Sequence, residues 1–188
     1  MTSATLHIEN STNCPLEIAT VLSGTGRIGI SKCPGKKQPR PGIGVPYERD
    51  TKADIAAIAD WGADVLLSLM EAAELKRYGA ADVGIRAKAA GLVWHHLPII
   101  DHKAPESSFE DAWRTVGPTL CQRLANGGSV AIHCLAGHGR SGTVACRLLI
   151  DMGMAPDDAI RHVREQRQHA VSTTVQERYL MERAWLRP

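Results

Sequence analysis

Hydrophobic and polar positions follow two different periods along the chain, and the two periods predict different elements. Around the turn signal SGTG, the segment PLEIATVLSGTGRIGISKCPGKK reads as two short strands. From Asp50 onward, segments of helical period such as KADIAAIADWG and EAAELKRYG alternate with short apolar runs such as ADVLLSL, LVWHHLPI and SVAIHC. This alternation predicts an α/β fold, with a central, mostly parallel twisted sheet flanked by helices.

Several helix ends carry their own signals. Ser107 or Ser108 is expected to cap a helix that runs from Phe109 to about Ala125. The helix SGTVACRLLIDMG is expected to stop at Gly153. Thr174–Glu177 has the pattern of a capping box and is expected to open the last helix.

Size and composition are those of one globular domain. The chain has 188 residues, of which 44% are hydrophobic. We expect a single domain over 1–188, with N-terminal strands and a basic loop in 1–49 and an α/β catalytic core in 50–188. The net charge of +2 is too small to indicate nucleic acid or a membrane surface as a partner. With no signal peptide and no membrane span in the sequence, we expect a cytoplasmic monomer.

The five cysteines are an odd number with no CxxC spacing, so we expect reduced thiols and no zinc site. Four of them read as structural residues, although the sequence does not say whether one can form a protective disulfide with Cys134 under oxidation. The segment CPGKKQPRPG reads as a loop that carries the basic residues Lys36, Lys37 and Arg40.

A glycine-rich loop joins the apolar run SVAIHC to the next helix, and it has Cys134 at one end and Arg140 at the other. In parallel sheets, binding sites form at the carboxyl ends of strands, which is where this loop lies. Its backbone N–H groups, the helix N-terminus and the Arg140 fork together predict a pocket for a phosphate dianion. The same positive field favours a thiolate, so we expect Cys134 to be a nucleophile facing the bound phosphoryl group.

Other interpretations of this loop fit its sequence less well. A lone buried cysteine is usually a packing residue, and a glycine-rich strand–loop–helix can bind a nucleotide. However, the loop lacks the Lys-Ser/Thr ending of a nucleotide-triphosphate loop and lacks GxGxxG. A phosphate-binding module without turnover, a rhodanese-type sulfur transferase and an arsenate reductase also remain, but the five-residue gap and the Arg-Ser ending favour a phosphatase.

The motif HCLAGHGRSG resembles the His-Cys-x5-Arg-Ser/Thr signature of cysteine-based protein tyrosine phosphatases. Its glycines resemble the dual-specificity branch, and most of all small phosphatases similar to cyclin-dependent-kinase-inhibitor-associated phosphatase. The segments IGISKCPGKK, LPIIDHKAPE and STTVQERYL are similar to the N-terminal segment, acid loop and glutamine region of that group. The resemblance implies hydrolysis of phosphotyrosine, and of phosphoserine or phosphothreonine, in a phosphoprotein or phosphopeptide through a cysteinyl-phosphate.

The resemblance also implies a role for each site residue. Cys134 attacks phosphorus, Asp101 is the general acid and then the base, Ser141 donates to the sulfur, and Gln176 positions the water. His133 supports the loop from behind. The phosphate-binding residues are Leu135, Ala136, Gly137, His138, Gly139 and Arg140.

The sequence offers alternative general acids and a possible metal site. Glu106 and Asp111 are the alternative acids, although both read as helix-start residues. His95 and His96 point to opposite faces of a strand and cannot easily share one ion, and the implied mechanism needs neither a metal nor a cofactor.

Two positions of the loop bear on the substrate. Phosphoinositide phosphatases carry lysine where this chain has Leu135 and His138, which weakens a lipid substrate as the alternative. The sequence leaves open whether the basic loop at Lys36–Arg40 compensates for this.

Overall fold

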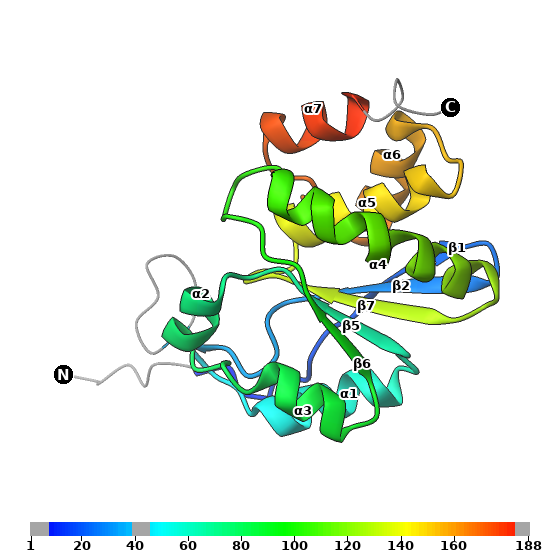
Figure 1. The fold of residues 1–188 in the computed structure, drawn as a ribbon. Helices are drawn as coiled ribbons and strands as arrows, with labels where there is room; N and C mark the ends of the chain where they lie inside the picture. The colour runs from blue at the N-terminus through cyan, green and yellow to red at the C-terminus, as the bar shows by residue number, and fades with distance from the viewer. Residues whose placement is uncertain (1–7, 39–45, 183–188) are drawn as a thin grey trace.

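A computed structural model gives the structure of this chain and describes residues 8–38 and 46–182. Strands and helices alternate along most of the described chain (Figure 1). In chain order the elements are β1 (Ala19–Ser23), β2 (Gly26–Ser31), β3 (Lys37–Gln38), β4 (Tyr47–Glu48), α1 (Thr51–Asp60), β5 (Val65–Ser68), α2 (Ala72–Arg77), α3 (Val83–Ala89), β6 (Val93–His96), α4 (Ser107–Ala125), β7 (Ser129–His133), α5 (Gly139–Asp151), α6 (Pro156–Gln166) and α7 (Thr174–Glu182).

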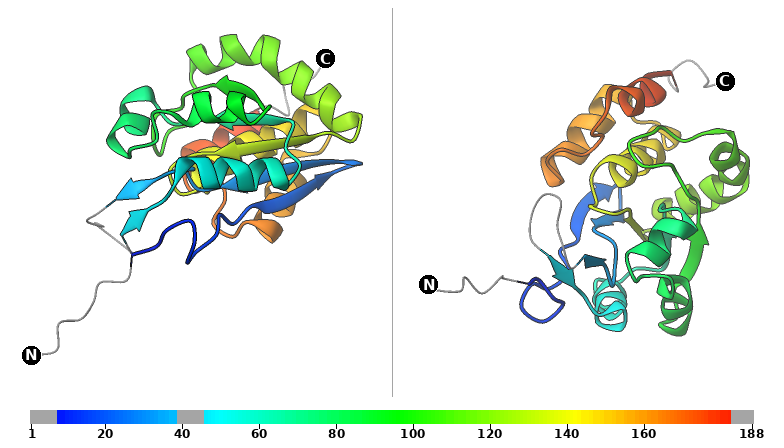
Figure 2. Two further views of the ribbon diagram at one scale, coloured as in Figure 1. Left: turned by 90° about the horizontal axis from the view of Figure 1, so that it is seen from below. Right: turned by 90° about the vertical axis from the view of Figure 1, so that its left-hand side faces the viewer.

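A five-stranded sheet in the order β1-β2-β7-β5-β6 forms the centre of the fold. The strands β2, β7, β5 and β6 run parallel, and β1 pairs antiparallel with β2 across the predicted turn. Helices α4 to α7 lie on one side of the sheet and α1 to α3 on the other, as Figure 1 and the right-hand view of Figure 2 show. The predicted α/β fold with a mostly parallel sheet is therefore confirmed.

The central strand β7 is buried along its whole length because helices cover both of its faces. Val130 and Ile132 belong to the larger core under α4 to α7, whereas Ala131 between them faces the smaller core under α1 and α3. This two-sided burial explains why the middle of the strand, Val130 to Ile132, is continuously apolar. His133 pairs with Ser31 of β2 and Ser68 of β5, so Cys134 leaves the sheet between two neighbouring strands.

The start of α4 differs from the prediction. The helix begins at Ser107, two residues before the expected start, and Glu106 rather than a serine holds the capping position. Glu106 is extended, with φ −103° and ψ −177°, and makes no side-chain capping bond. Because the extended conformation is at Glu106, Ser107 and Ser108 lie in the first turn of the helix and not at its cap.

The predicted capping box at Thr174–Glu177 is wrong by one residue. Thr173, just before α7, supplies the cap, because its Oγ1 accepts the N–H of Gln176 at 3.4 Å. The Glu177 carboxylate instead pairs with Arg164 of α6 at 2.5 Å. A tertiary ion pair has thus taken the side chain that the local pattern assigned to the helix start.

Part of the predicted basic loop is described. Lys37–Gln38 pairs with Tyr47–Glu48 as a separate two-stranded sheet, while Arg40 lies outside the described residues. The helix that follows Cys134 ends as predicted, with Gly153 at φ +110° just beyond it.

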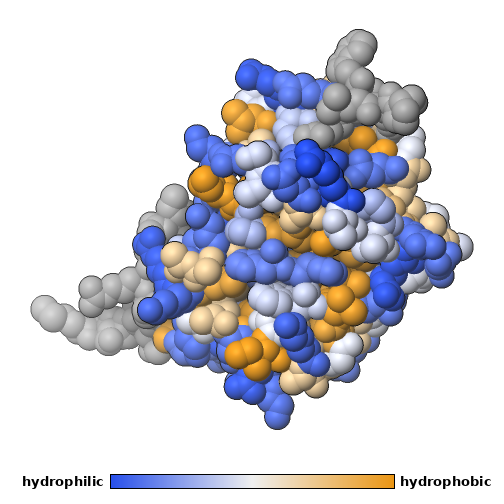
Figure 3. All heavy atoms as spheres, viewed as in Figure 1, coloured by the Kyte–Doolittle hydropathy of each residue, from blue (hydrophilic) through white to orange (hydrophobic). Residues whose placement is uncertain are grey.

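Within 8–38 and 46–182, no helix combines the length and the hydrophobicity that a membrane span needs. On the face seen in Figure 3, hydrophobic side chains lie among hydrophilic ones. Large hydrophobic side chains that are exposed include Leu22 and Ile85.

Candidate active site

The loop from Cys134 to Arg140 connects the carboxyl end of β7 to the first turn of α5. Its tight path depends on Gly137, whose φ of +73° is in the left-handed region. A Cβ at Gly137 would also lie 2.5 Å from the carbonyl oxygen of Ser31. Both the backbone angle and the close approach to β2 therefore require glycine here.

The Cys134 sulfur is almost enclosed, since the residue is 3% exposed. The Gly137 N–H donates to Sγ at 3.3 Å. This is the inward-facing amide that the sequence predicted for an anion-binding loop, and here it points at the sulfur itself.

Arg167, which the sequence analysis did not single out, holds the outer side of the same loop. Its Nη2 donates to the Ala136 carbonyl at 3.1 Å and its Nε to the Gly137 carbonyl at 2.9 Å. Because a peptide unit is planar and trans, turning the Ala136 carbonyl outward turns the Gly137 N–H inward, toward Sγ. Arg167 also pairs with Glu17 at 3.2 Å, so it ties the loop to the segment before β1.

Arg140 is 1% exposed and carries a buried positive charge. Glu74 of α2 accepts from its Nη1 at 2.6 Å and from its Nη2 at 3.1 Å, and the Ile99 carbonyl accepts from Nη1 at 3.1 Å. Burial opposes the charge, but the hydrogen-bonded Glu74 and the neighbouring Cys134 and Asp101 outweigh it and raise the pKa of Arg140. The Nε atom is buried and has no hydrogen-bond partner in the described part of the chain, which leaves a donor for a bound anion.

Asp101, the predicted acid, lies against this guanidinium. Its Oδ1 is 3.0 Å from Arg140 Nη2, and its side chain is 45% exposed. The N–H of His102, a residue with φ +61°, donates to the same oxygen at 3.1 Å. Of the alternative acids, Glu106 occupies the capping position of α4 and Asp111 pairs with Arg114 at 3.0 Å. The structure thus brings Asp101 to Arg140.

Gln176 lies close to the loop from the α7 side and is 1% exposed. Its Oε1 accepts the Ser172 N–H at 3.0 Å, and its Nε2 donates to the Lys103 carbonyl at 3.1 Å. A Cβ at Gly139 would lie 3.1 Å from this amide, so Gln176 lies against the loop of Cys134. Through Lys103 it also contacts the loop that carries Asp101.

Ser141, on the first turn of α5, is fully buried. Its hydroxyl has no hydrogen-bond partner among the described residues. Its donation to the cysteine sulfur stays a prediction.

His133 is completely buried behind the loop. Its Nε2 lies 2.6 Å from Ser68 Oγ, which also accepts the indole N–H of Trp94 at 2.8 Å. Burial, with smaller effects from the charges of Arg140 and His96, lowers the pKa of His133 to about 3. The ring is therefore neutral at ordinary pH, and its role in supporting the loop stays a prediction.

Two side chains of the loop turn to partners outside it. Leu135 packs against the smaller core, and its carbonyl accepts the Cys33 N–H at 3.3 Å. His138 Nδ1 lies 3.1 Å from the Gln168 carbonyl, and burial together with the Arg167 charge lowers the pKa of His138. The loop therefore offers its backbone N–H groups and Arg140 to an anion.

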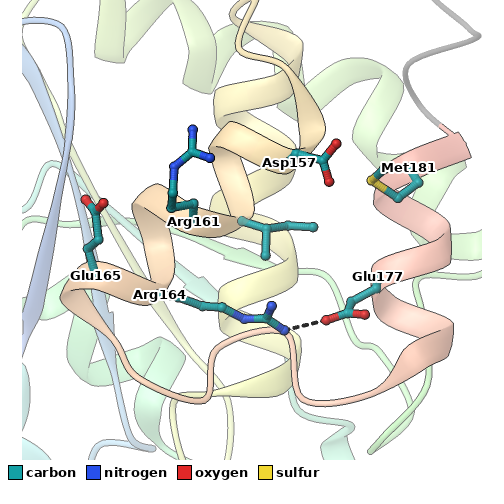
Figure 4. A pocket seen from close by; sticks show the side chains of 7 residues that line it. Asp157, Arg161, Arg164, Glu165, Glu177 and Met181 are labelled. Carbon is teal, nitrogen blue, oxygen red and sulfur yellow. Dashed lines mark hydrogen bonds and ion pairs between the residues drawn. The ribbon is translucent and has the colours of Figure 1, made fainter.

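A separate groove of about 750 Å³ lies between α6 and α7 (Figure 4). Its lining residues include the paired Arg164 and Glu177, and none of them belongs to the cysteine loop or to the acid loop. In the described residues there is also no group of three or more His, Cys, Asp or Glu side chains arranged for a metal ion.

Two contacts of the site, from Glu74 to Arg140 and from Arg167 to the loop, had no signal in the sequence, because each side chain comes from a distant element.

A buried cysteine, an arginine and a carboxylate at the carboxyl end of a mostly parallel sheet define the fold and site of a cysteine-dependent phosphatase. Residues 41–154 match the family described as "Tc-R-P: Polymorphic toxin system, DSP-PTPase phosphatase". The chain belongs to this family of DSP-PTPase phosphatases.

Curated relatives and solved structures agree with this assignment. The chain is 31% identical over 111 residues to protein tyrosine phosphatase type IVA 3 of Homo sapiens, covering 53% of this chain and 62% of the relative. It is 29% identical over 136 residues to cyclin-dependent kinase inhibitor 3 of Mus musculus, covering 71% of this chain and 63% of the relative. The match thus spans less than two thirds of either relative.

Among solved structures, kinase associated phosphatase with its catalytic-site cysteine replaced by serine superposes with a TM-score of 0.75 at 25% identity, covering 89% of this chain and 93% of that chain. The active form of Tk-PTP superposes with a TM-score of 0.62 at 27% identity, covering 84% and 93%. The predicted similarity to the kinase-inhibitor-associated phosphatases is confirmed.

Proposed function

We propose that this chain removes phosphate from phosphotyrosine, and from phosphoserine and phosphothreonine, in proteins through a cysteinyl-phosphate intermediate. The observation that carries the proposal is the convergence of three groups from separate elements. The sulfur of Cys134, which accepts the Gly137 N–H, the guanidinium of Arg140 and the carboxylate of Asp101 lie beyond the carboxyl ends of β7 and β6, with Arg140 and Asp101 3.0 Å apart. The relatives named tyrosine phosphatases support the same reaction class.

In the first step, the Cys134 thiolate attacks phosphorus and the bond from phosphorus to the ester oxygen breaks. The inward N–H groups of the loop and Arg140 bind the three equatorial oxygens, where the charge of the transition state lies. Arg140 offers its free Nε together with Nη2, once the dianion has replaced the Asp101 carboxylate there. Asp101, in its protonated form, gives its proton to the departing oxygen.

In the second step, water attacks the cysteinyl-phosphate, and the bond between sulfur and phosphorus breaks to release inorganic phosphate. Asp101 accepts the proton of the water. The Gln176 amide, which touches both loops, orients that water. Ser141 directly follows Arg140, and its hydroxyl has no hydrogen-bond partner among the described residues. It is therefore available to donate a hydrogen bond to the departing sulfur.

Hydrolysis of an aryl phosphate by point variants tests this proposal. Cys134→Ser is expected to lose turnover entirely, and Arg140→Lys to lose roughly 10³-fold because it cannot bind two oxygens in one plane. Asp101→Asn should lose roughly 10²-fold or more with a poor leaving group, and much less with p-nitrophenolate, which needs no proton. Asp111→Asn is the matched control and should keep full activity. Wild-type turnover by Cys134→Ser would overturn the mechanism.

Phosphoproteins are favoured over inositol lipids as substrates. The two loop positions that carry lysine in phosphoinositide phosphatases are occupied by Leu135, which packs in the core, and by His138, which is bonded to the Gln168 carbonyl. Neither side chain is placed to bind a second phosphate of an inositol ring. A panel of phosphopeptides and phosphoinositides in vesicles tests this choice, and faster release from the lipids would contradict it.

We also propose that the catalytic unit works as a single-domain monomer in the cytoplasm. The pairing of β2 with β7 supports one domain, since the N-terminal strands complete the sheet from which Cys134 emerges. Gel filtration at micromolar concentration would contradict the monomer if the protein eluted as a dimer.

A further inference from the structure

Two lysines gather on one aromatic ring beside the cysteine loop. The Lys36 ammonium lies 4.3 Å from the centre of the Tyr47 ring and 6.0 Å from that of Tyr78, and the Lys32 ammonium lies 5.0 Å from the Tyr47 ring. We call Lys32, Lys36, Tyr47 and Tyr78 the lysine–tyrosine cluster. Tyrosine faces attract cations but cannot neutralise them, so the cluster keeps its positive charge.

The charges in the cluster are not balanced. Lys32 pairs with Glu9 at 3.5 Å. Lys36 is only 7% exposed, and in the described chain no carboxylate or hydrogen-bond acceptor partners its ammonium. Burial lowers the pKa of Lys36, and the Lys32 charge lowers it further. The nearby Cys33 and Cys134 sulfurs and the Glu9 carboxylate raise it. An almost enclosed ammonium without a hydrogen-bonded carboxylate is costly unless an anion completes it.

Lys36 is nevertheless not completely enclosed, since 7% of the residue's surface is exposed to solvent.

Backbone hydrogen bonds hold the cluster next to the cysteine loop. The Lys36 N–H donates to the Cys33 carbonyl at 3.3 Å, and the Cys33 N–H donates to the Leu135 carbonyl at 3.3 Å. On the other side, the Lys37 N–H donates to the Tyr78 carbonyl at 2.8 Å, at the end of the helix whose Glu74 binds Arg140. The cluster therefore lies between the cysteine loop and α2, and the Lys36 ammonium is near enough to Cys134 to interact with its charge.

We propose that the lysine–tyrosine cluster binds a second anionic group of a peptide substrate, a carboxylate or a second phosphate that flanks the phosphorylated residue. This inference rests on the proposed function and adds a preference to it. A lysine ammonium is a compact point charge, so it accepts either anion without the planar match that arginine demands. The tyrosine rings fix its position, so less side-chain entropy is lost when the anion binds.

Three phosphotyrosine peptides of one parent sequence test the preference. One has neutral flanking residues, one has glutamates on both flanks, and one has a non-hydrolysable phosphonate analogue of phosphoserine next to the phosphotyrosine. We expect the wild type to show a higher kcat/KM for each acidic peptide than for the neutral one, by about fivefold at low salt, and a smaller preference at high salt. The two acidic peptides distinguish a carboxylate from a phosphate as the preferred group.

Variants at neighbouring lysines assign the preference to the cluster. Lys36→Met keeps the length of the side chain and should reduce the ratio of acidic to neutral peptide to about one, while Lys36→Arg should restore it. Lys37→Met is the matched control, since Lys37 is the next residue but pairs with Glu48 at 2.9 Å, and it should keep the ratio. The ratio is insensitive to a loss of folded protein, because all peptides meet the same enzyme.

Other results would overturn the inference. A wild-type enzyme that hydrolyses all three peptides equally, or a Lys36→Met variant that keeps the preference, excludes the cluster as an anion site for peptides. A Lys36→Met defect confined to phosphoinositide vesicles, with the peptide ratio unchanged, would assign the cluster to lipids and refute it too. If the wild type released phosphate from no peptide at all, the proposed function itself would fail.

Discussion

At the scale of single residues, the charge of Arg140 depends on a partner from another part of the chain. Glu74 binds both terminal nitrogens of the guanidinium, at 2.6 and 3.1 Å. We expect Glu74→Gln to lower the free energy of unfolding by about 2 kcal/mol, because a buried cation loses its carboxylate. The kcat/KM for an aryl phosphate should fall roughly tenfold, since the guanidinium is then free to turn away from the pocket.

Denaturant unfolding and steady-state kinetics measure both effects. Glu182→Gln, which changes an exposed acid at the end of α7, is the control and should alter neither quantity. An unchanged stability in Glu74→Gln would show that the pair contributes nothing to the fold.

His133 makes the stability of the fold depend on pH. Burial lowers its pKa to about 3, whereas an unfolded chain has histidine near 6.5. Between these values the unfolded state binds a proton that the folded state does not, so stability is lost as pH falls from about 6.5 toward 3. One such group contributes about 1.4 kcal/mol for each pH unit within this range.

Urea unfolding at pH 7 and at pH 5 for wild type and His133→Gln checks this expectation. The variant is less stable at pH 7 because it disturbs the bond to Ser68, but it should lose less stability than the wild type on acidification. Equal losses in the two proteins would mean that His133 is not the residue responsible.

The sequence identified some site residues and not others for a physical reason. Cys134 and Arg140 stand at the two ends of one continuous loop, so their spacing alone indicates their chemistry. Glu74 and Arg167 act only through the tertiary fold, and each lies in an ordinary charged helix or helix end. Nothing in the local pattern distinguishes them from solvated charges.

At the scale of elements, the connection between β7 and α5 depends on a glycine at one position, Gly137. Gly137 and Gly91 both have a positive φ, at +73° and +82°, but a Cβ would meet β2 at Gly137 and nothing within 4 Å at Gly91. We expect Gly91→Ala to cost about 1 kcal/mol of stability through backbone strain alone, with full activity.

Gly137→Ala should cost more stability and abolish turnover, because the shifted loop no longer directs its N–H at the sulfur. Thermal melts and aryl phosphate assays on the two variants separate strain from crowding. Full activity in Gly137→Ala would show that the loop tolerates a different path.

Element types were predictable here, but two helix starts were not. The helical periods and the closing glycines follow from local chemistry, and the structure confirms them at Gly153. The caps of α4 and α7 instead depend on tertiary features, namely the extended entry at Glu106 and the pairing of Glu177 with Arg164.

At the scale of the whole molecule, Arg167 joins three distant parts of the chain. It follows α6, binds the carbonyls of Ala136 and Gly137, and pairs with Glu17 before β1. We expect Arg167→Met to lower kcat/KM roughly tenfold and to weaken inhibition by inorganic phosphate, since the loop N–H groups lose their fixed direction.

The chain offers a matched control for this variant. Arg161→Met removes an arginine inside α6, one that pairs only with Asp158 in the described structure, and should leave phosphate binding unchanged. Arg167→Lys should recover part of the loss, because an ammonium can still reach a carbonyl. A purely structural role would lower stability in Arg167→Met without weakening phosphate inhibition of the folded enzyme.

The contact between Asp101 and Arg140 has a consequence for which ligands can enter. In the free protein the guanidinium already has a monovalent anion of its own at 3.0 Å. Binding of a monoanion such as acetate or nitrate replaces one negative charge beside Arg140 with another, so it adds little electrostatic stabilisation. A dianion adds one further unit of negative charge, so we expect the site to favour dianions over monoanions by charge alone.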